Sequence, residues 1–333
     1  MGKTILVTGG AGYIGAHACK ALSKAGYEPV AYDNLVYGHR EAVRWGPLIE
    51  GDLADRALLT ETIARHKIAA IMHFAAYAYV GESIEKPEKY FHNNVVNSLG
   101  LMETMLSTGV KTIVFSSTCA TYGLPESMPI REETPQRPVN PYGESKLMIE
   151  RALYWHGVAH GIRHVALRYF NAAGADPDGE IGEAHQPETH LIPLILDVAH
   201  GRRAQIDVFG TDYPTPDGTA IRDYIHVQDL AEAHVLALRY LEGGGESVAL
   251  NLGTGEGHSV RATIETAKRV TGRPIAARDT ARRPGDPPVL VADATRARQL
   301  LGWTPSLAAL ERIIETAWAW HQHHFGAPRG ARP

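Results

Sequence analysis

The chain has 333 residues, of which 44% are hydrophobic and 21% charged, a composition that indicates a folded globular protein and excludes a mainly disordered one. Its 33 Lys and Arg against 37 Asp and Glu give a net charge of −4, so no bulk positive charge attracts nucleic acid or an anionic membrane. No apolar run reaches the roughly 18 residues of a transmembrane helix, and two cysteines cannot form a disulfide framework, so we expect a cytoplasmic protein without nucleic-acid or membrane partners.

Short apolar runs alternate with longer helical segments in the first half of the chain. The runs have the β-branched composition of buried strands: Ile5–Val7, Pro29–Tyr32, Ala70–Phe74, Thr112–Phe115 and Val165–Leu167. In the segments between them, apolar residues recur with the spacing of a helix: Ala16–Ala25, Asp55–His66, Pro87–Ser107 and Pro141–His160. Strands that alternate with helices predict an α/β fold with a doubly wound parallel sheet.

The first strand leads into a glycine-rich turn that opens the first helix. Gly9, Gly12 and Gly15 are spaced so that the backbone turns tightly and approaches a pyrophosphate, while the helix N-terminus offers N–H groups to the anion. Asp33 ends the second strand, 18 residues after Gly15, where a carboxylate binds ribose hydroxyls and repels a 2′-phosphate. This arrangement predicts an NAD site; the remaining interpretation of Asp33 is a strand-end cap.

Two further strand ends are weaker candidates for cofactor contacts. Gly51-Asp52-Leu53 ends a third strand, where Asp52 would meet the adenine. Phe74-Ala75-Ala76 ends the fourth, where small residues leave room for a nicotinamide ribose, although alanine pairs usually serve only packing.

A tyrosine and a lysine follow Pro141, a favoured first helical residue. Tyr142 and Lys146 are four residues apart and therefore share one helix face. A nearby ammonium, together with the positive charge of an oxidised nicotinamide, lowers the pKa of a phenol, which then accepts a proton from an alcohol. Ser116-Ser117-Thr118 ends an earlier strand, and its Thr118 would bind the reacting hydroxyl beside Tyr142.

The pattern changes after about Asn171. Residues 172–221 are rich in Gly, Pro and Asp and contain one apolar helical run, Leu191–Ala199. A strand and a helix return at residues 224–240, and Val248–Leu252 predicts another strand. Residues 259–323 predict a few helices around short strands, and we expect the tail from Gly326 to Pro333 to fray.

In order and spacing, these motifs resemble the extended short-chain dehydrogenase/reductase family, and within it the UDP-sugar 4-epimerases. The resemblance runs from Ile5 to about Trp320. Besides the motifs above, it rests on Val80-Gly81-Glu82-Ser83, Asn93-Asn94-Val95, Arg168-Tyr169-Phe170-Asn171, Phe209-Gly210-Thr211-Asp212-Tyr213, Arg222-Asp223-Tyr224-Ile225-His226-Val227, Asn251-Leu252-Gly253 and Arg282-Arg283-Pro284-Gly285-Asp286.

The resemblance implies an isomerase that holds NAD and interconverts UDP-galactose and UDP-glucose through a transient 4-keto sugar. Tyr142 would take the proton of the C4 hydroxyl, Thr118 would bind the C4 oxygen, and Lys146 would bind the nicotinamide ribose and lower the pKa of Tyr142. The implied cofactor-binding residues are Gly9, Gly12, Tyr13, Ile14, Gly15, Asp33, Asn34, Asp52, Leu53, Phe74, Ala75, Ala76, Asn93, Ser116, Tyr142, Lys146 and Tyr169.

The resemblance also implies a UDP-sugar site. Arg222 and Arg283 would bind the diphosphate, since guanidinium groups match phosphate oxygens. Asn171 would bind the diphosphate region, Asp286 a ribose hydroxyl, and Phe209 would border the uracil. The implied substrate-binding residues are Thr118, Tyr142, Asn171, His190, Leu191, Phe209, Arg222, Arg283, Asp286 and Leu290.

Three positions depart from the family pattern. Ala78 replaces a lysine that contacts the cofactor, and His190 replaces an asparagine on the uridine side. Leu290 stands where strict glucose/galactose enzymes have a tyrosine, and this smaller side chain favours entry of an N-acetylated sugar.

Other functions remain as alternatives. A UDP-xylose/UDP-arabinose 4-epimerase uses the same catalytic residues, as does a UDP-N-acetylhexosamine epimerase. Dehydratases and decarboxylases of this fold need carboxylates just after Thr118, where this chain has Cys119 and Ala120. A non-enzymatic NAD-binding regulator usually lacks the tyrosine or the lysine.

The sequence predicts no metal site and no covalent nucleophile. His321, His323 and His324 are interpreted as solvated tail residues, because positions two apart do not share a helix face. Cys119 is interpreted as a packing residue, because the implied chemistry has no covalent step.

The resemblance further implies a Rossmann domain and a smaller substrate lobe. Residues 1–172 and 222–256 would bind NAD, and residues 173–221 and 257–333 would bind the UDP-sugar. Relatives form homodimers through helices near residues 90–107 and 141–160, and apolar residues are available there.

Overall fold

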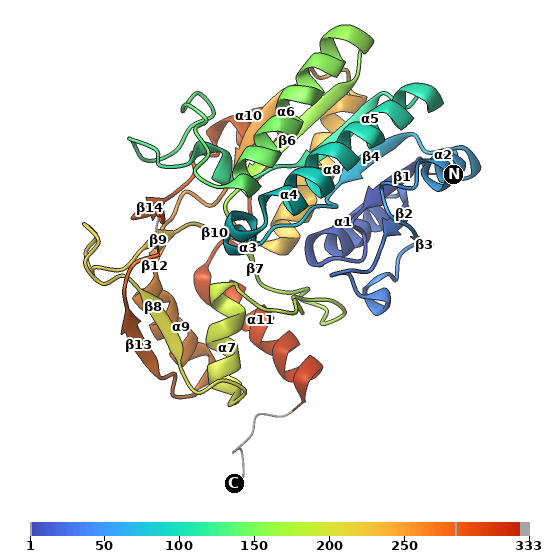
Figure 1. The fold of residues 1–333 in the computed structure, drawn as a ribbon. Helices are drawn as coiled ribbons and strands as arrows, with labels where there is room; N and C mark the ends of the chain where they lie inside the picture. The colour runs from blue at the N-terminus through green and yellow to red at the C-terminus, as the bar shows by residue number, and fades with distance from the viewer. Residues whose placement is uncertain (1, 284, 327–333) are drawn as a thin grey trace.

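A computed structural model describes residues 2–283 and 285–326 of the chain (Figure 1). Its centre is a seven-stranded sheet with the order β11-β6-β5-β4-β1-β2-β3, in which every pair is parallel. The strands are β1 (Thr4–Thr8), β2 (Glu28–Asp33), β3 (Leu48–Glu50), β4 (Ala70–His73), β5 (Thr112–Ser116), β6 (Arg163–Tyr169) and β11 (Val248–Leu252).

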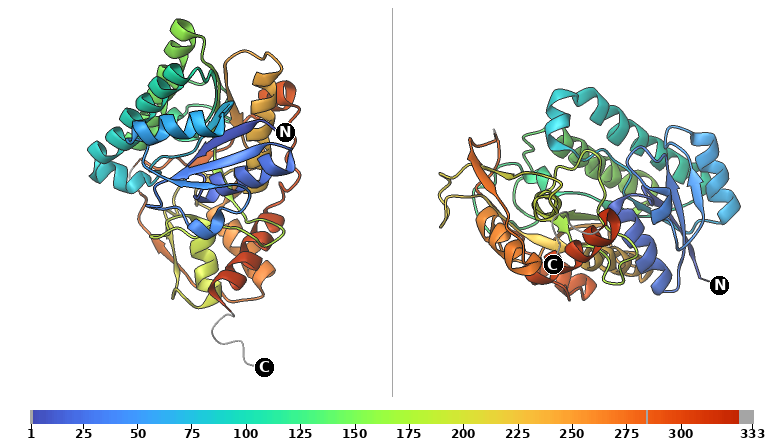
Figure 2. Two further views of the ribbon diagram at one scale, coloured as in Figure 1. Left: turned by 90° about the vertical axis from the view of Figure 1, so that its right-hand side faces the viewer. Right: turned by 90° about the horizontal axis from the view of Figure 1, so that it is seen from below.

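Helices cover both faces of this sheet (Figures 1 and 2). In β1, Ile5 and Val7 belong to one hydrophobic core and Leu6 to another, as the alternation of side chains along a strand requires. The first core is closed by α1 (Tyr13–Lys24), α8 (Val227–Glu242) and α10 (Thr295–Leu301); the second is closed by α2 (Arg56–His66), α5 (Asn97–Thr108) and α6 (Pro141–His160). This confirms the predicted doubly wound α/β fold.

The order of the strands reverses between β1 and β4. The chain runs outward through β1, β2 and β3, then returns to the other side of β1 and continues through β4, β5 and β6. In sheets of this type, ligands bind at the carboxyl ends of the strands beside such a switch point. The glycine turn after β1 and the Phe74–Ala76 segment after β4 both lie there.

Two predicted elements differ in the structure. The single helix expected from Pro87 to Ser107 is divided into α4 (Pro87–Tyr90), the π-helical segment η2 (Phe91–Val96) and α5. Within η2 the buried Asn94 side chain bonds the backbone of Tyr77, a distant contact that helical periodicity does not reveal. The third strand ends at Glu50, and Asp52 lies beyond it, where its carboxylate accepts a hydrogen bond from the backbone N–H of Ala54 and turns the chain.

A second group of elements gathers at one end of the sheet, away from α5 and α6 (Figures 1 and 2). Its core is built from the apolar faces of three helices, α7 (Leu191–His200), α9 (Val260–Thr271) and α11 (Leu310–Phe325). Short strands pair around this core: β7 (Asn171–Ala173) with β10 (Tyr224–His226), β8 (Ile206–Phe209) with β13 (Ala277–Thr280), and β9 (Ile221–Arg222) with β12 (His258–Ser259) and β14 (Val289–Leu290). The remaining helical pieces are η1 (Arg40–Ala42), α3 (Val80–Glu85) and η3 (Cys119–Tyr122).

The prediction of a solvated histidine tail is wrong for His321. This side chain is buried and its Nε2 lies 3.0 Å from Oδ1 of Asp197, because α11 continues to Phe325 and packs this face against α7. His323 and His324 are exposed, as expected. The fraying was expected from Gly326 to Pro333, and all of this tail except Gly326 lies outside the described residues.

None of the helices in the described part of the chain is both long enough and apolar enough to cross a lipid bilayer.

Candidate active site

The glycine turn is shaped by contacts that exclude side chains. Gly9 has φ +73°, and a Cβ there would lie 2.7 Å from the backbone nitrogen of Ala75. A Cβ on Gly15 would lie 2.1 Å from the carbonyl oxygen of Gly9. Gly12 precedes α1, which has no capping side chain and no acidic residue in its first turn. The turn therefore leaves backbone N–H groups and the positive end of the helix dipole for an anion such as a pyrophosphate.

Asp33 is placed by β2 directly beneath this turn. Its Oδ2 accepts a hydrogen bond of 3.0 Å from the backbone N–H of Ala11, and its Oδ1 accepts one of 2.9 Å from Leu35. Burial raises the pKa of the Asp33 carboxyl, and these two hydrogen bonds counteract that rise. Asp33 therefore holds the turn as a strand-end cap, and each oxygen keeps a second lone pair for a ribose hydroxyl.

Asn34 and Asp52 meet beside Asp33. The Asn34 side chain donates a 2.7 Å hydrogen bond to Oδ2 of Asp52, although 18 residues separate them in sequence. Leu53 is buried in the core next to them. The predicted adenine side of the cofactor site thus comes together at the ends of β2 and β3.

The remaining predicted cofactor residues lie on other elements near the carboxyl ends of the strands. Tyr13 and Ile14 begin α1, and the Tyr13 hydroxyl donates to the carbonyl oxygen of Gly174 at 2.6 Å. Phe74 follows β4 and packs on His234 with 4.6 Å between ring centres. Asn93 lies in η2, where its amide donates to Asn94. Ala75 and Ala76 are half-buried beside the glycine turn.

The catalytic candidates converge where α6 passes the end of β5. Nζ of Lys146 donates a 2.8 Å hydrogen bond to the carbonyl oxygen of Ser116 and lies 5.9 Å from the centre of the Tyr142 ring. The hydroxyls of Ser116 and Tyr169 lie 2.7 Å apart. Thr118 caps η3, with its hydroxyl accepting from the backbone of Ala120. Asn140 caps the start of α6 and fixes the helix that carries the pair.

Burial controls the protonation of Tyr142 and Lys146. Burial raises the pKa of the Tyr142 phenol well above its usual value, Tyr169 adds to the rise, and a hydrogen bond with Thr118 opposes it. Burial lowers the pKa of the Lys146 ammonium to about 7, against the opposing effect of Glu150. Lys146 was expected to lower the pKa of Tyr142. The protein groups alone do not produce this lowering, because burial changes the pKa of both side chains more than the neighbouring charges do.

Arg222, Asp286 and Leu290, three of the predicted substrate-binding residues, lie together. Nη2 of Arg222 lies 2.6 Å from Oδ1 of Asp286, and Leu290 pairs with Arg222 between β14 and β9. Leu290 also packs on a cluster that contains Cys119. Burial raises the pKa of the Cys119 thiol to about 12, opposed by the Arg222 charge, which supports a packing role for Cys119 and places the guanidinium near it.

Asn171 begins β7 and donates its amide to the carbonyl oxygen of Asp223 at 3.1 Å. Arg283 and Phe209 form a separate pair, with the guanidinium 4.0 Å from the ring centre. No hydrogen bond or ion pair within residues 2–283 and 285–326 joins that pair to Tyr142.

His190 immediately precedes α7, and Leu191 begins that helix. The His190 imidazole faces Glu183 and Glu188 rather than Arg222, with Nδ1 2.9 Å and 2.8 Å from their carboxylate oxygens.

Sequence reasoning missed a buried ion pair on α6, the helix that carries Tyr142 and Lys146. Glu150 accepts hydrogen bonds from Nε and Nη2 of Arg168, at 3.0 Å and 2.6 Å, and from the hydroxyl of Ser117. This pair ties α6 to the ends of β5 and β6. The sequence could have indicated Glu150, because Tyr142, Lys146 and Glu150 follow one another at four-residue intervals and therefore share one helix face.

A lysine was also missed near the departure at Ala78. Nζ of Lys89 lies 4.4 Å from the ring centre of Tyr77 and 2.8 Å from Oε1 of Glu82. A cation is therefore present beside the segment in which Ala78 replaces a family lysine.

Comparisons with known proteins agree with this geometry. Residues 5–253 match the model of the NAD dependent epimerase/dehydratase family. The chain is 54% identical to a UDP-glucose 4-epimerase of Rhizobium leguminosarum bv. trifolii, over 96% of this chain and 98% of that protein. A UDP-glucose 4-epimerase of Brucella ovis crystallised with NAD is similar, with a TM-score of 0.94, 52% identity and coverage of 97% and 98%. So is one from Stenotrophomonas maltophila crystallised with NAD and formylated UDP-arabinopyranose, with a TM-score of 0.94, 39% identity and coverage of 97% and 99%.

Proposed function

The chain belongs to the NAD dependent epimerase/dehydratase family, and from that membership we propose that it interconverts UDP-glucose and UDP-galactose by NAD-dependent epimerisation at C4 of the sugar. The observation that carries the proposal is the meeting of Tyr142, Lys146 and Thr118 at the strand ends that also carry the glycine turn. A non-enzymatic NAD-binding regulator would not need this buried group of three side chains.

The residues around the crevice fit NAD. Gly9 and Gly15 have no room for a side chain, the start of α1 is uncapped, and Asp33 disfavours a 2′-phosphate. When bound, NAD would supply reversible acceptance of a hydride from C4 of the sugar. Cofactor binding by Gly12, Tyr13, Asn34 and the other predicted residues is part of this proposal.

Tyr142 acts as the general base in this mechanism. Its phenolate takes the proton of the C4 hydroxyl while the C4 hydrogen leaves as hydride. Once the 4-keto sugar has presented its other face, the hydride returns to C4 and Tyr142 gives the proton back to the C4 oxygen. Thr118 holds the C4 oxygen. Because burial keeps the pKa of the phenol high, its activation needs positive charge beyond that of Lys146, and an oxidised nicotinamide carries such a charge.

The UDP part is held on the other wall. Arg222 and Arg283 bind the diphosphate, Asn171 binds the same region, and Phe209 borders the uracil. The ion pair between Arg222 and Asp286 orients the guanidinium, and Asp286 keeps an oxygen for a ribose hydroxyl. His190 and Leu191, at the start of α7, also contribute to binding of the UDP-sugar.

A second candidate is a pentose 4-epimerase, because a similar structure was crystallised with a UDP-arabinopyranose derivative. A third is an N-acetylhexosamine epimerase, since Leu290 rather than a tyrosine lines the wall near Cys119. All three use the same base and the same cofactor, so they differ in the sugar that fits against Leu290.

An initial-rate assay on UDP-galactose tests the proposal, with UDP-glucose formation followed by a coupled UDP-glucose dehydrogenase. UDP-N-acetylgalactosamine and UDP-arabinose are assayed in parallel by separation of products. We expect turnover of UDP-galactose. Activity on the pentose alone would move the assignment to a pentose epimerase, and inactivity on every sugar, with NAD bound, would refute the catalytic proposal.

Replacement of Arg283 by alanine is expected to raise KM for UDP-galactose by roughly 10- to 100-fold with little change in kcat, because a diphosphate contact is lost equally in the ground and transition states. Arg282→Ala is the matched control. The Arg282 side chain is already paired with Asp212 and stacks at 4.2 Å on the Tyr213 ring, so its loss should leave KM within about threefold. Equal effects of the two substitutions on KM would contradict the diphosphate role.

The proposal divides the chain into an NAD-binding part, residues 1–172 and 222–256, and a substrate part, residues 173–221 and 257–333. Its support is the separate core of α7, α9 and α11 and the single sheet that joins β1 to β6 with β11. Two features do not follow this division. Tyr224 lies in the first part by sequence but packs in the core of the second. Helix α10 and Trp303 lie in the second part by sequence but pack in the core of the central sheet.

We also propose that two copies associate through α5 and α6, which lie side by side (Figure 1). These helices and the residue preceding α5 expose large apolar side chains: Val96, Leu99, Met148, Tyr154, Trp155 and Val158. Several large exposed apolar side chains on neighbouring helices are typical of a protein interface.

Trp155→Glu is expected to convert the dimer to a monomer in light-scattering measurements, because Trp155 is 64% exposed in the single chain and a charge there would be buried in the interface. Leu300→Glu, on the exposed side of α10, is the control and should leave the dimer intact. A wild-type monomer, or a dimeric Trp155→Glu, would contradict this arrangement.

The cytoplasmic location also remains a proposal. Its support is the cysteine content: Cys19 and Cys119 are both free and buried, as is usual in a reducing compartment.

A further inference from the structure

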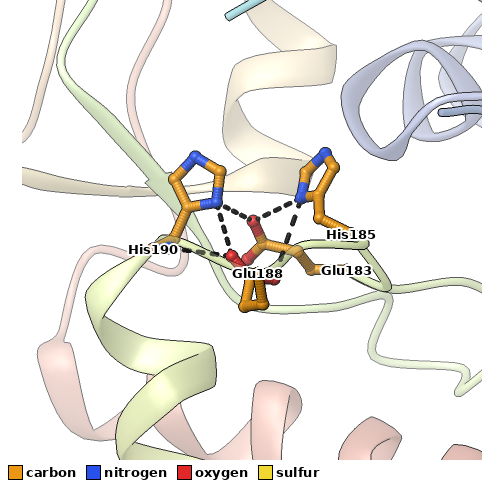
Figure 3. Close-up of side chains that lie close together, drawn as sticks. All are labelled: Glu183, His185, Glu188 and His190. Atoms are coloured by element: carbon orange, nitrogen blue, oxygen red, sulfur yellow. Dashed lines mark hydrogen bonds and ion pairs between the residues drawn. The ribbon is translucent and has the colours of Figure 1, made fainter. Parts of the chain in front are cut away.

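A cluster of histidine and glutamate side chains lies in the loop before α7, outside the catalytic group. Glu183, His185, Glu188 and His190 point toward one centre (Figure 3). Their ligand atoms all lie within 4.8 Å of one another. Nδ1 of His190 is 2.9 Å from an oxygen of Glu183 and 2.8 Å from one of Glu188, and Nδ1 of His185 is 3.1 Å and 3.8 Å from the same two carboxylates.

The cluster concentrates negative charge in a sheltered place. The side chain of Glu183 is 6% exposed and that of Glu188 is 14% exposed. Within residues 2–283 and 285–326, no lysine or arginine forms an ion pair with either carboxylate. Buried carboxylates require a cationic partner, and among the described residues the two imidazoles are the groups that lie close enough to balance them.

A neighbouring acidic cluster in the same loop shows the usual solution. Asp176, Asp178 and Glu180 surround Nζ of Lys20 at 2.7, 2.7 and 2.6 Å, so this ammonium fills the position that a metal ion would take. The cluster from Glu183 to His190 has no such lysine. In its place it has two imidazole nitrogens, which are metal ligands.

We propose that Glu183, His185, Glu188 and His190 form a binding site for a divalent transition-metal ion of the Zn²⁺ class. Two imidazoles and two carboxylates are ligands suited to such an ion, whereas Mg²⁺ and Ca²⁺ prefer oxygen ligands alone. Metal–ligand bonds of about 2.0 Å in a tetrahedron put neighbouring ligand atoms about 3.3 Å apart. The observed nitrogen–oxygen separations are partly shorter and partly longer than that value, so small shifts of the side chains would allow them to coordinate an ion.

The surroundings hold the ligands in place. The backbone N–H groups of Thr189 and His190 donate to Oε1 of Glu188, at 2.7 Å and 2.8 Å. The Tyr13 ring packs edge-on against His185 with 6.2 Å between ring centres. A cavity of about 260 Å³, lined in part by Glu183, His185 and Glu188, offers an entry path. Supporting contacts of this kind orient the ligands of a metal site.

Such an ion would act structurally. The cluster lies between Tyr13, at the start of α1, and His190, which leads into α7. A bound ion would hold this loop, which connects β7 to α7, in place beside the start of α1. The cluster overturns the prediction that the chain has no candidate metal ligands, and its signal in the sequence is the Glu-x-His-x-x-Glu-x-His spacing of residues 183–190.

The ion must compete with a proton. Burial opposes a charge on His190, but Glu183 and Glu188 outweigh it and raise the pKa of this imidazole to about 10. In the metal-free protein the His190 imidazolium therefore serves as the counter-ion. Metal binding displaces that proton, as ligation by a histidine requires.

The test is a Co²⁺ titration of the full-length protein at about pH 8, after removal of metals with a chelator. We expect one equivalent to bind with the visible absorption of four-coordinate Co²⁺, to be displaced by Zn²⁺ and not by Mg²⁺ or Ca²⁺. His185→Ala and Glu188→Gln should each weaken binding at least about tenfold. Neither readout depends on epimerase activity, so this test and the test of the proposed function fail independently.

Asp178→Asn is the matched control, because it changes an exposed carboxylate of the Lys20 cluster and should leave Co²⁺ binding unaltered. Circular dichroism establishes that each variant is folded; if His185→Ala is not, Glu188→Gln decides. The proposal is overturned if Co²⁺ binds without saturation, if only six-coordinate absorption appears, or if the folded ligand variants bind as well as Asp178→Asn.

Discussion

Replacement of Tyr142 by phenylalanine is expected to lower kcat for UDP-galactose by about 10³-fold, while the protein stays folded and retains NAD. Phenylalanine fills the same buried space, so the packing of α6 against β5 is kept. Only the hydroxyl that takes the C4 proton is lost, and general-base catalysis contributes about 10²- to 10⁴-fold. The measurement is kcat in the coupled assay, together with the amount of cofactor released on denaturation.

Tyr154→Phe is the control for this substitution. It removes a hydroxyl from the same helix, but Tyr154 is 57% exposed and its side chain lies outside the catalytic group. We expect its kcat to stay within about twofold of wild type. If Tyr142→Phe kept more than a tenth of the wild-type kcat with NAD bound, another group would have to be the base.

The part of the site that the sequence predicted well depends on local patterns. The turn from Gly9 to Gly15 and Asp33 at the end of β2 follow from the strand–turn–helix pattern of a parallel sheet, and the structure has both in place. Helix α6 begins and ends where Pro141 and His160 predict, because Asn140 caps its start and Gly161 ends it with φ +69°. These features can be predicted without knowing which distant residues are in contact.

The features that the sequence did not predict depend on tertiary contacts. The π-helical segment η2 accompanies the bonds of Asn94 to Tyr77 and Ser145, from separate elements. The pairing of Glu150 with Arg168 joins a helix to a strand. The direction of the His190 imidazole depends on how the loop from Glu183 folds back on itself. Periodicity and single motifs carry no information on such distant partners.

Protonation was the least predictable property, because it depends on burial. Placing Tyr142 and Lys146 on one helix face is a local inference, and the structure agrees with it. The expected lowering of the pKa of Tyr142 assumed that the ammonium dominates. In the structure both groups are almost fully buried, and loss of water affects each pKa more than the neighbouring charge.

Lys146→Met is therefore expected to have two opposite effects. It should lower kcat by about 10²- to 10³-fold, since a ribose contact and a cation beside Tyr142 are lost. It should also stabilise the NAD-free protein near pH 7, because methionine fills the space of the lysine stem without a charge to bury. Urea unfolding and the coupled assay measure the two effects.

The sign of the stability change follows from the pKa of Lys146. Burial lowers it from the usual 10.5 to about 7, so between these values the unfolded chain binds more protons than the folded one. Because of Lys146, the free energy of unfolding of the wild type therefore rises with pH between these two values. The variant has no lysine at this position and lacks that rise. The advantage of Lys146→Met should be largest near pH 7 and shrink toward about pH 9.

Lys24→Met, at an exposed position of α1, is the control and should change the free energy of unfolding by less than about 0.5 kcal/mol at either pH. A Lys146→Met difference that did not vary between pH 7 and pH 9 would contradict the lowered pKa. The ammonium would then remain charged beside Tyr142 without the help of a bound cofactor. A difference that shrinks as expected means that only about half of the Lys146 side chains in the free protein carry a charge near pH 7. Binding of a positively charged nicotinamide would then select the phenolate of Tyr142, so proton removal would begin only when the cofactor is present to accept the hydrogen from C4.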